Sequence, residues 1–511
     1  MQMSSLALIL CSAALGFLIH SVLSRRRPAR SPPLPPGPRP WPIVGNLPQL
    51  GPKPHQSMAA LAQLYGPLLH LKMGFAHVVV AASAAVAQQF LKAHDANFSS
   101  RPPNAGAKHV AYNYQDMVFA PYGPRWRLFR KISALHLFSA KALDDFRHVR
   151  QDEVGILCRA LAGAGQTPVR LGQMLNVCAT NAISRVMMGK RVVGHDSGGS
   201  GGDEKAEEFK AMVVELMVLA GVFNIGDFIP ALERFDLQRV VAKMKKLHTR
   251  FDNFLTTIVN DHTIDDQNKG HVDLLSTLIS FKDGEDSLTD TEIKALLLNL
   301  FAAGTDTTSS TVEWAIAELI RHPEILSQAQ QELDSIVGKN RFVTESDLPQ
   351  LVYLQAVVKE NFRLHPSTPL SLPRIAEKSC DINGYHIPKG STLLVNVWAI
   401  SRDSEQWADP LEFRPDRFLP GGEKPNVDVK GNDFELIPFG AGRRICAGMS
   451  LGIRMVQLLT ATIVHAFDFD LANGLLPQKL NMEEAYGLTL QRAEPLIVHP
   501  KPRLAYHVYK A

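Results

Sequence analysis

The segment Phe439-Gly-Ala-Gly-Arg-Arg-Ile-Cys446-Ala-Gly448 decides the fold of this chain, and an apolar stretch with helical periodicity follows it directly. Cys446 would therefore stand where a helix begins, and there free N–H groups and the helix dipole stabilise a thiolate. The surrounding glycines allow tight turns and a close approach of the backbone to a flat ligand. These features favour a cysteine thiolate that binds haem iron in a water-poor site. The alternative is a buried structural cysteine, which is what most isolated cysteines are.

Length and composition exclude several classes of protein. The chain has 511 residues, of which 45% are apolar and 20% are charged, so it can bury a large core. This balance excludes a disordered chain, a collagen-like fibre and a multi-span membrane protein. Five widely spaced cysteines without a CxxC pair argue against a disulfide framework and a structural zinc site. A net charge of +4 is too small to indicate nucleic-acid binding.

The amino terminus has the features of a membrane anchor. Residues 1–24 contain no Asp, Glu, Lys or Arg, and the apolar run Leu6–Leu23 is long enough to span a bilayer. Three arginines follow at 25–27, which by the positive-inside rule places the rest of the chain in the cytosol. A cleaved signal peptide would instead carry its positive charge before the apolar run. We expect a transmembrane anchor at 1–24, a basic and proline-rich hinge at 25–54 and a catalytic domain at 55–511.

Helical periodicity dominates the rest of the chain, and we expect a mainly α fold with a smaller β region. A flexible surface loop is predicted at His195–Glu204 from its glycine, serine and acidic residues. Strand-like runs occur at Leu68–Ala81 and Ser391–Val397. The predicted helical segments are 125–160, 205–220, 238–262, 290–321, 323–337, 350–364 and 448–468.

Two further motifs, in order along the chain, make the cysteine loop specific. Glu360-Asn-Phe-Arg363 has the i,i+3 spacing that puts both charged side chains on one helix face. Phe413-Arg-Pro-Asp-Arg417-Phe418 supplies another arginine before the cysteine loop. Together with Cys446, these motifs resemble those of the cytochrome P450 family. The resemblance implies the cytochrome P450 fold, a haem b cofactor with a cysteine thiolate ligand, and a structural role for Glu360, Arg363 and Arg417 behind the haem.

The segment Ala303-Gly-Thr-Asp-Thr-Thr308 lies inside a helical pattern, although Gly, Thr and Asp are poor helix formers. One interpretation is a weak helix whose hydroxyls bond to its own carbonyls. The resemblance implies instead a local widening that makes room for dioxygen. Thr307 would then serve oxygen activation as a hydrogen-bond donor, and Asp306 would help to relay protons. Thr307 and Asp306 are therefore the candidate catalytic residues.

The resemblance also assigns residues to the cofactor. Trp126-Arg-Leu-Phe-Arg130 is similar to the family's WxxxR helix, and Arg374 is similar to another ligand of a haem propionate. The alternative for each of these is ordinary surface charge. The implied cofactor-binding residues are Trp126, Arg130, Arg374, Phe439, Gly442, Arg444 and Gly448, with Cys446 as the metal ligand.

A narrower resemblance concerns the substrate. Several segments, among them Val78–Ser83, Arg363–Arg374 and Glu484–Leu490, resemble those of plant flavonoid 3′-hydroxylases. This implies a monooxygenase that hydroxylates the 3′ position of a flavonoid B ring. A flavonoid 3′,5′-hydroxylase, a 5′-hydroxylase of 3′-substituted flavones and a non-oxygenating haem-thiolate protein stay open as alternatives. The implied substrate contacts are Phe119, Ala303, Thr368, Leu370, Leu488 and Thr489.

The expected partners follow from the same resemblance. The chain has no GxGxxG motif and no P-loop, so electrons from NADPH would arrive through a separate NADPH–cytochrome P450 reductase. Arg125, Arg127, Lys131 and Arg443 are the basic residues expected to face that acidic partner. The anchor and hinge imply a single-pass protein of the endoplasmic reticulum membrane with its catalytic domain on the cytosolic side, and no nucleic-acid partner is expected.

Overall fold

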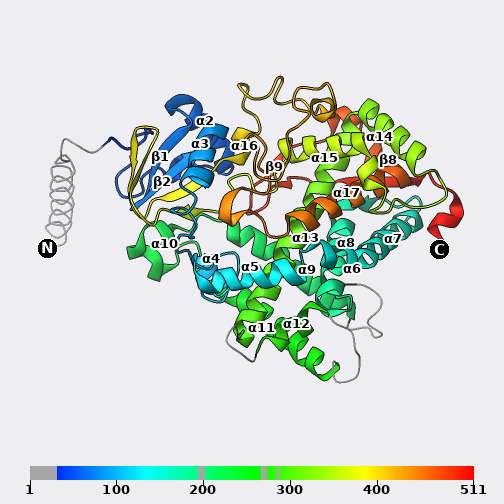
Figure 1. Cartoon of the computed structure of the whole chain (residues 1–511), viewed down its shortest axis with the longest axis horizontal. Helices are drawn as coiled ribbons and strands as arrows, with labels where there is room; N and C mark the ends of the chain where they lie inside the picture. Colours follow the sequence, from blue (N-terminus) through cyan, green and yellow to red (C-terminus); the bar gives the residue numbers. More distant parts are fainter. Residues whose placement is uncertain (1–31, 194–201, 266–272, 283–286, 511) are drawn as a thin grey trace, which may run out of the picture.

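The computed structural model of the chain describes residues 32–510, except 194–201, 266–272 and 283–286. The predicted anchor at 1–24, the first part of the hinge and most of the predicted loop at 195–204 lie outside the described residues. Figure 1 shows a body dominated by helices, with a sheet at one end. The strand β8 (Phe467–Leu471) lies toward the other end.

The helices follow the predicted mainly α pattern. They are α2 (Pro54–Tyr65), α3 (Ala84–Gln88), α4 (Ala105–His109), α5 (Pro124–His136), α6 (Ala140–Asp145), α7 (Arg147–Gly163), α8 (Leu171–Met188), α9 (Gly202–Gly221), α10 (Ile225–Phe228), α11 (Val240–Asp265), α12 (Leu274–Ser280), α13 (Asp290–Arg321), α14 (Pro323–Ile336), α15 (Val352–Leu364), α16 (Val397–Ile400) and α17 (Met449–Ala466).

The strands form a minor part of the fold. They are β1 (Leu68–Met73), β2 (Ala76–Ala81), β3 (Val169–Arg170), β4 (Arg374–Ile375), β5 (Cys380–Ile382), β6 (Tyr385–Ile387), β7 (Thr392–Val395), β8 (Phe467–Leu471), β9 (Glu484–Ala485), β10 (Gln491–Arg492) and β11 (Ile497–Pro502). The largest described sheet has the order β1-β2-β7-β4, in which β2 and β7 are parallel. A second sheet has the order β3-β11-β8.

The single long helix predicted at 125–160 is wrong, because this segment forms α5, α6 and α7. The Ser139 hydroxyl accepts a hydrogen bond from the Ala142 N–H, which caps a new helix immediately after α5 ends. Phe146, between α6 and α7, has φ −94° and ψ 12°, outside the helical range. Local capping therefore interrupts a segment whose apolar periodicity reads as continuous.

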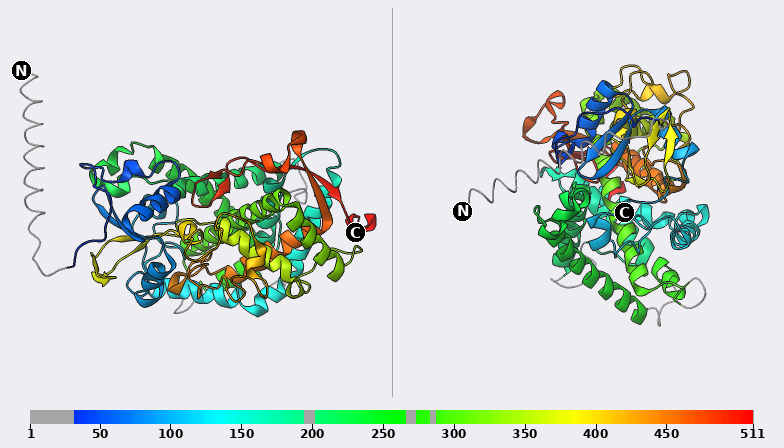
Figure 2. Two further views of the ribbon diagram at one scale, coloured as in Figure 1. Left: turned by 90° about the horizontal axis from the view of Figure 1, so that it is seen from above. Right: turned by 90° about the vertical axis from the view of Figure 1, so that its left-hand side faces the viewer.

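Helix α13 is the central element of the molecule and is buried over most of its length. Thr289 and Glu292 form a capping box at its start, which satisfies backbone donors that have no intrahelical partner. At Gly304 a Cβ atom would lie 2.1 Å from Ile183 Cδ1 of α8, so a larger residue here would require the Ile183 side chain to shift. Figures 1 and 2 show α11 and α12 on one side of the molecule and the β1-β2-β7-β4 sheet on the other.

Candidate active site

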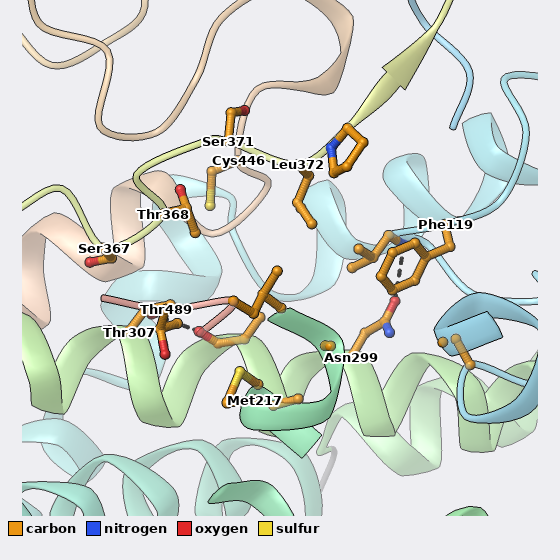
Figure 3. A pocket seen from close by; sticks show the side chains of 18 of the residues that line it. Phe119, Met217, Asn299, Thr307, Ser367, Thr368, Ser371, Leu372, Cys446 and Thr489 are labelled. Carbon is orange, nitrogen blue, oxygen red and sulfur yellow. Dashed lines mark hydrogen bonds between the residues drawn. The ribbon is translucent and has the colours of Figure 1, made fainter. Parts of the chain in front are cut away.

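A large internal cavity lies between the middle of α13 and the loop that precedes α17. Its volume is about 640 Å³, and apolar side chains form most of its wall. Figure 3 shows the wall closely, with Cys446 on the loop and Thr307 on α13 at opposite sides of the space. Segments far apart in the sequence complete the enclosure: 101–119, 216–228, 367–375 and 486–489. A cavity of this size and character suits a flat cofactor together with an aromatic substrate.

Cys446 is the one described cysteine that borders this cavity. Its N–H donates to the Phe439 carbonyl over 3.0 Å, and the Phe439 ring packs edge-on against Phe362 with centroids 5.2 Å apart. Burial raises the pKa of the Cys446 thiol, while a hydrogen bond from the Gly448 N–H and the charge of Arg130 act in the opposite direction. A bound metal cation would complete the stabilisation of the thiolate.

Gly442 faces away from the cavity, although the sequence motif assigned it to the cofactor. It has φ 70°, which favours glycine, and an added Cβ would lie 2.4 Å from the Leu91 carbonyl oxygen. The same Cβ would lie 2.5 Å from Asp95 Oδ1. Gly442 therefore allows the cysteine loop to pack on the segment 89–95. Gly440 and Gly448 are the motif glycines that border the cavity.

Three arginines gather at one edge of the cavity and provide a test of whether a haem fits. Arg101, Arg374 and Arg444 all border it, and burial lowers the pKa of each, to about 10 for Arg374 and for Arg444. Repulsion by neighbouring arginines adds to this effect at Arg101 and Arg444. The carboxylates that act on this cluster are Asp95 and Asp116. Positive charge therefore exceeds negative charge in a buried place, which requires an anionic partner. The two propionates of a haem supply that partner, so the residues fit the cofactor.

The guanidinium groups of this cluster are already oriented by the protein. Arg374 donates to the Ala441 carbonyl over 2.8 Å and to Asp95 over 3.3 Å. Arg444 donates to the Ser99 carbonyl over 2.6 Å and lies 4.5 Å from the centroid of the Trp126 ring. Oriented donors bind an anion without a further ordering cost.

Trp126 and Arg130 both lie on α5 and border the cavity. Arg130 donates to the Ile445 carbonyl over 3.0 Å and lies over the Trp126 ring, 5.7 Å from its centroid. The WxxxR segment is therefore joined to the cysteine loop next to Cys446. This contact brings Trp126 and Arg130 of α5 to the side of the cavity that Cys446 borders.

Arg101 and Asp95 are site residues that sequence analysis missed. Arg101 donates to the carbonyls of Leu372 and Pro373 over 2.8 and 2.9 Å. Asp95 accepts from Arg374 and, over 2.8 Å, from Arg443. In the sequence, each is a single charged residue outside any recognisable motif, and the only local signal is the proline pair that follows Arg101.

Helix α13 continues without a break through the segment 303–308. The local widening that was expected there does not interrupt the helix. The Thr307 hydroxyl donates to the Ala303 carbonyl over 2.7 Å, and the Thr311 hydroxyl donates to the Thr307 carbonyl over 2.7 Å. This is the back-bonding that the alternative interpretation predicted. Thr307 nevertheless borders the cavity, and its oxygen can still accept a further hydrogen bond.

Asp306 is not among the described residues that border the cavity, so its position differs from that expected of a direct proton relay. Successive residues of a helix differ by about 100° in direction, which turns Asp306 away when Thr307 faces inward. Its carboxylate accepts a hydrogen bond from the Thr489 hydroxyl. The side-chain amide of Gln491 donates to both carboxylate oxygens, over 2.9 and 3.0 Å. Burial raises the pKa of Asp306, and these two hydrogen bonds oppose the rise.

The residues predicted to contact substrate all border the cavity. They are Phe119, Ala303, Thr368, Leu370, Leu488 and Thr489. Asn299, Met217 and Ser371 also border it (Figure 3). Asn299 accepts hydrogen bonds from the N–H groups of Met117 and Val118 over 3.0 and 3.1 Å, which holds the loop that carries Phe119 against α13.

Behind the cysteine loop, Glu360 lies at the centre of a fully buried ion cluster. Its carboxylate accepts from Arg363 over 2.7 and 2.8 Å and from Arg417 over 3.3 Å. Arg363 also donates to the carbonyls of Ser401, Pro410 and Glu412. The cluster joins α15 to the segment 401–417, which leads into the cysteine loop.

Comparison with known proteins agrees with this geometry. The family model described as Cytochrome P450 matches residues 35–498. The chain is 70% identical to the flavonoid 3′-monooxygenase of Petunia hybrida, over 99% of this chain and 100% of the relative. It is 65% identical to the flavonoid 3′-monooxygenase of Arabidopsis thaliana, over 99% of each chain. It is 56% identical to a flavonoid 3′,5′-hydroxylase of Crocosmia x crocosmiiflora, over 100% of this chain and 99% of the relative. The chain therefore belongs to the cytochrome P450 family.

Proposed function

We propose that this cytochrome P450 adds one hydroxyl group to the 3′ position of the flavonoid B ring. The observation that carries the proposal is the 70% identity, over essentially the whole chain, to a relative named flavonoid 3′-monooxygenase. The large apolar cavity, with a thiol at one side and a helix hydroxyl opposite, supports it because a flat polyphenol can lie between them.

Haem b, when bound, supplies the activation of dioxygen with electrons that come from NADPH through a separate reductase. In our proposal Cys446 holds the iron, and the Gly448 N–H and Arg130 stabilise its thiolate. Arg374 and Arg444, together with Arg101, bind the propionates at the charged edge of the cavity. The Glu360 cluster keeps the cysteine loop in place from behind.

Thr307 is the proposed proton-handling residue at the substrate side of the cavity. Its hydroxyl has an acceptor in the Ala303 carbonyl, so the lone pairs of its oxygen are left for a water or another donor.

We expect the Thr307→Ala variant to bind haem and substrate normally. Most of the electrons that it takes from NADPH should form hydrogen peroxide instead of hydroxylated product. General acid–base groups contribute roughly 10²–10⁴-fold, and a single positioned hydroxyl lies at the low end of that range. Product and peroxide are measured together, with Thr307→Ser as a control expected to restore coupling. An unchanged product yield per NADPH in Thr307→Ala would contradict the role.

The second candidate function is 3′,5′-dihydroxylation, which some of the relatives carry in their names. Thr489 borders the cavity, and because its hydroxyl donates to Asp306, its methyl group is left to meet a substrate. One methyl group changes discrimination by about 1–3 kcal/mol, or roughly 10–200-fold. We expect the wild type to stop at the 3′,4′-diol and Thr489→Ser to raise the trihydroxylated fraction. Mass spectrometry of the products decides this, and a predominantly trihydroxylated product from the wild type would favour the second candidate.

We propose that the reductase binds over α5 and the cysteine loop. Arg125 is a poor test because it is bonded to Glu292 of α13, so charge reversal there would disturb packing. Arg127 is exposed and lies over the Tyr122 ring. Rim charges act mainly on association rates. We expect Arg127→Glu to slow iron reduction at low salt and to leave substrate affinity unchanged, whereas Lys389→Glu, an exposed control, has no effect. Equal reduction rates for Arg127→Glu and wild type across a salt series would rule out this surface.

We propose that residues 1–24 anchor the protein in the endoplasmic reticulum membrane as a single span, with the hinge at 25–54 and the domain at 55–511 on the cytosolic side. Exposed apolar side chains near the sheet end support a position of this end against the membrane. They are Trp41, Ile43, Phe75, Phe235 and Leu237. Phe75 is joined to the helical side by its N–H, which donates to the Phe228 carbonyl over 2.9 Å. Apolar side chains exposed in this part of the domain are available for contact with the membrane surface.

Two described stretches, Ala211–Phe228 and Met449–Ala466, have the length and hydropathy of a membrane span. Met449–Ala466 is α17, whose side chains pack in the main core. Ala211–Phe228 includes the end of α9 and borders the cavity. Neither replaces the amino-terminal run as the proposed anchor.

The experiment that tests the proposed function is turnover of a substrate panel. The protein, reconstituted with reductase and NADPH, is given a flavanone, a dihydroflavonol, a flavone and a 3′-methoxyflavone. We expect hydroxylation of the first three at the 3′ position and little conversion of the fourth. No conversion of any member, in a preparation whose carbon monoxide spectrum shows thiolate ligation, would refute the proposal.

A further inference from the structure

We propose that Thr489 and Gln491 are positioning residues that hold the Asp306 carboxyl, and that the Thr489 hydroxyl links this carboxyl to the cavity. The inference rests on the proposed function, because it assigns Asp306 a part in proton delivery during hydroxylation. It gives Thr489 a role in addition to the steric one at the substrate.

The first observation is the position of the carboxyl. Asp306 is 4% exposed and lies on α13 outside the cavity wall, while its neighbour Thr307 borders the cavity. Thr489 is 2% exposed, borders the cavity and donates its hydroxyl hydrogen to Asp306 Oδ2. The Thr489 side chain thus lies between the carboxyl and the cavity. Any proton that passes from Asp306 toward the substrate side by this route meets the Thr489 oxygen first.

The second observation is the lack of a charged partner among the described contacts of Asp306. Its hydrogen-bond partners are a hydroxyl and the amide of Gln491, both neutral. Glu313 on α13 is a charged neighbour whose pKa Asp306 raises, and Arg492 on β10 acts on Glu313 in the opposite direction. Burial raises the pKa of Asp306. A carboxyl without a cation can exchange its proton more readily than one fixed in an ion pair.

The third observation is that the backbone of the 489–491 segment is fixed independently of this contact. The Leu490 N–H donates to the Ser367 carbonyl over 2.8 Å, and the Leu490 carbonyl accepts from Ser310 and from Trp314 over 3.0 and 3.2 Å. Loss of the Thr489 hydroxyl therefore leaves the turn in place. A variant at Thr489 tests the hydrogen bond itself.

Two substitutions separate the steric role of Thr489 from the positioning role. Thr489→Ser keeps the hydroxyl and removes the methyl group, so it should alter the ratio of products, while the number of hydroxyl groups added per NADPH stays close to that of the wild type. Thr489→Val keeps the β-branched shape and removes the hydroxyl. It should lower product per NADPH roughly tenfold, as expected from the loss of one hydrogen bond to a carboxylate, with the product ratio unchanged.

The pH profile provides a readout that a merely structural role would not move. The hydrogen bond from Thr489 favours the charged carboxylate, so its removal raises the pKa of Asp306 further. When hydroxylation per NADPH is plotted against pH, the part of the curve that follows the titration of Asp306 should shift to higher pH in Thr489→Val. The same part of the curve should remain in place in Thr489→Ser. Gln491→Met, which removes the second donor, should shift this part of the curve in the same direction.

The experiment measures product, peroxide and NADPH for wild type, Thr489→Ser, Thr489→Val and Gln491→Met across a pH series, with carbon monoxide spectra as a check of folding. Wild-type product identity tests the proposed function, whereas the ratios between variants and wild type test this inference. Reduced coupling and a shifted curve in Thr489→Val, with both preserved in Thr489→Ser, support it. Wild-type coupling and an unmoved curve in Thr489→Val would overturn it, whatever the product.

Discussion

Replacement of Cys446 by alanine is expected to abolish both the thiolate-type Soret band with carbon monoxide and all hydroxylation. Cys446 borders the cavity in a loop whose backbone is closed by the hydrogen bond to Phe439. No other described cysteine borders it, so no second thiol can replace the lost ligand. The spectrum of the variant, recorded after expression with a haem precursor, measures the effect directly.

Two buried cysteines provide the matched controls. Cys158 is 0% exposed and Cys178 is 3% exposed, and both pack in the main hydrophobic core. Burial raises the pKa of each thiol, so they stay neutral and unreactive. Cys158→Ala and Cys178→Ala should retain the thiolate-type spectrum. A normal spectrum from Cys446→Ala would remove the basis of the proposed haem ligation.

Replacement of Glu360 by alanine is expected to prevent accumulation of folded protein. The change would leave Arg363 and Arg417, both fully buried, without their shared carboxylate. Removal of one partner from a buried ion pair costs about 3–5 kcal/mol. Such a loss is a large part of the about 5–15 kcal/mol that stabilises a typical domain. The yield of protein with a thiolate-type carbon monoxide spectrum and the thermal unfolding of the variant measure the loss.

A surface pair near the same cluster gives the control for Glu360. Asp409 is bonded to Arg414 over 2.9 Å, and both side chains are exposed. Exposed pairs contribute about 0–1 kcal/mol, so Asp409→Asn should unfold close to the wild-type temperature. Asp409 has φ 45°, a conformation that asparagine tolerates. Wild-type stability in Glu360→Ala would show that the cluster does not hold the cysteine loop.

The central motifs could be predicted from the sequence because each is local. The cysteine loop, the Glu360–Arg363 spacing and the periodicity of α13 all lie within short segments whose chemistry can be read directly. The helix that follows the loop begins at Met449, close to the predicted start at 448. Local sequence therefore determined the helical class and the cysteine side of the site.

What could not be predicted depends on contacts between distant segments. Asp95 and Arg374 are 279 positions apart, and nothing in either segment indicates that they meet. The hydrogen bond between Asp306 and Thr489 spans 183 positions and joins two residues that were predicted to have separate roles. Helical geometry explains why Thr307 faces the cavity while Asp306 faces away from it. This could be deduced only once the structure showed which side of α13 borders the cavity.

Identification of the product made from naringenin tests the central claim most directly. The full chain is incubated with reductase, NADPH and ¹⁸O₂, and the isolated product is analysed by nuclear magnetic resonance and mass spectrometry. The account predicts one labelled oxygen at C3′, beside the existing 4′-hydroxyl, with little further oxidation. A labelled hydroxyl on the A ring, or a mainly trihydroxylated B ring, would contradict it.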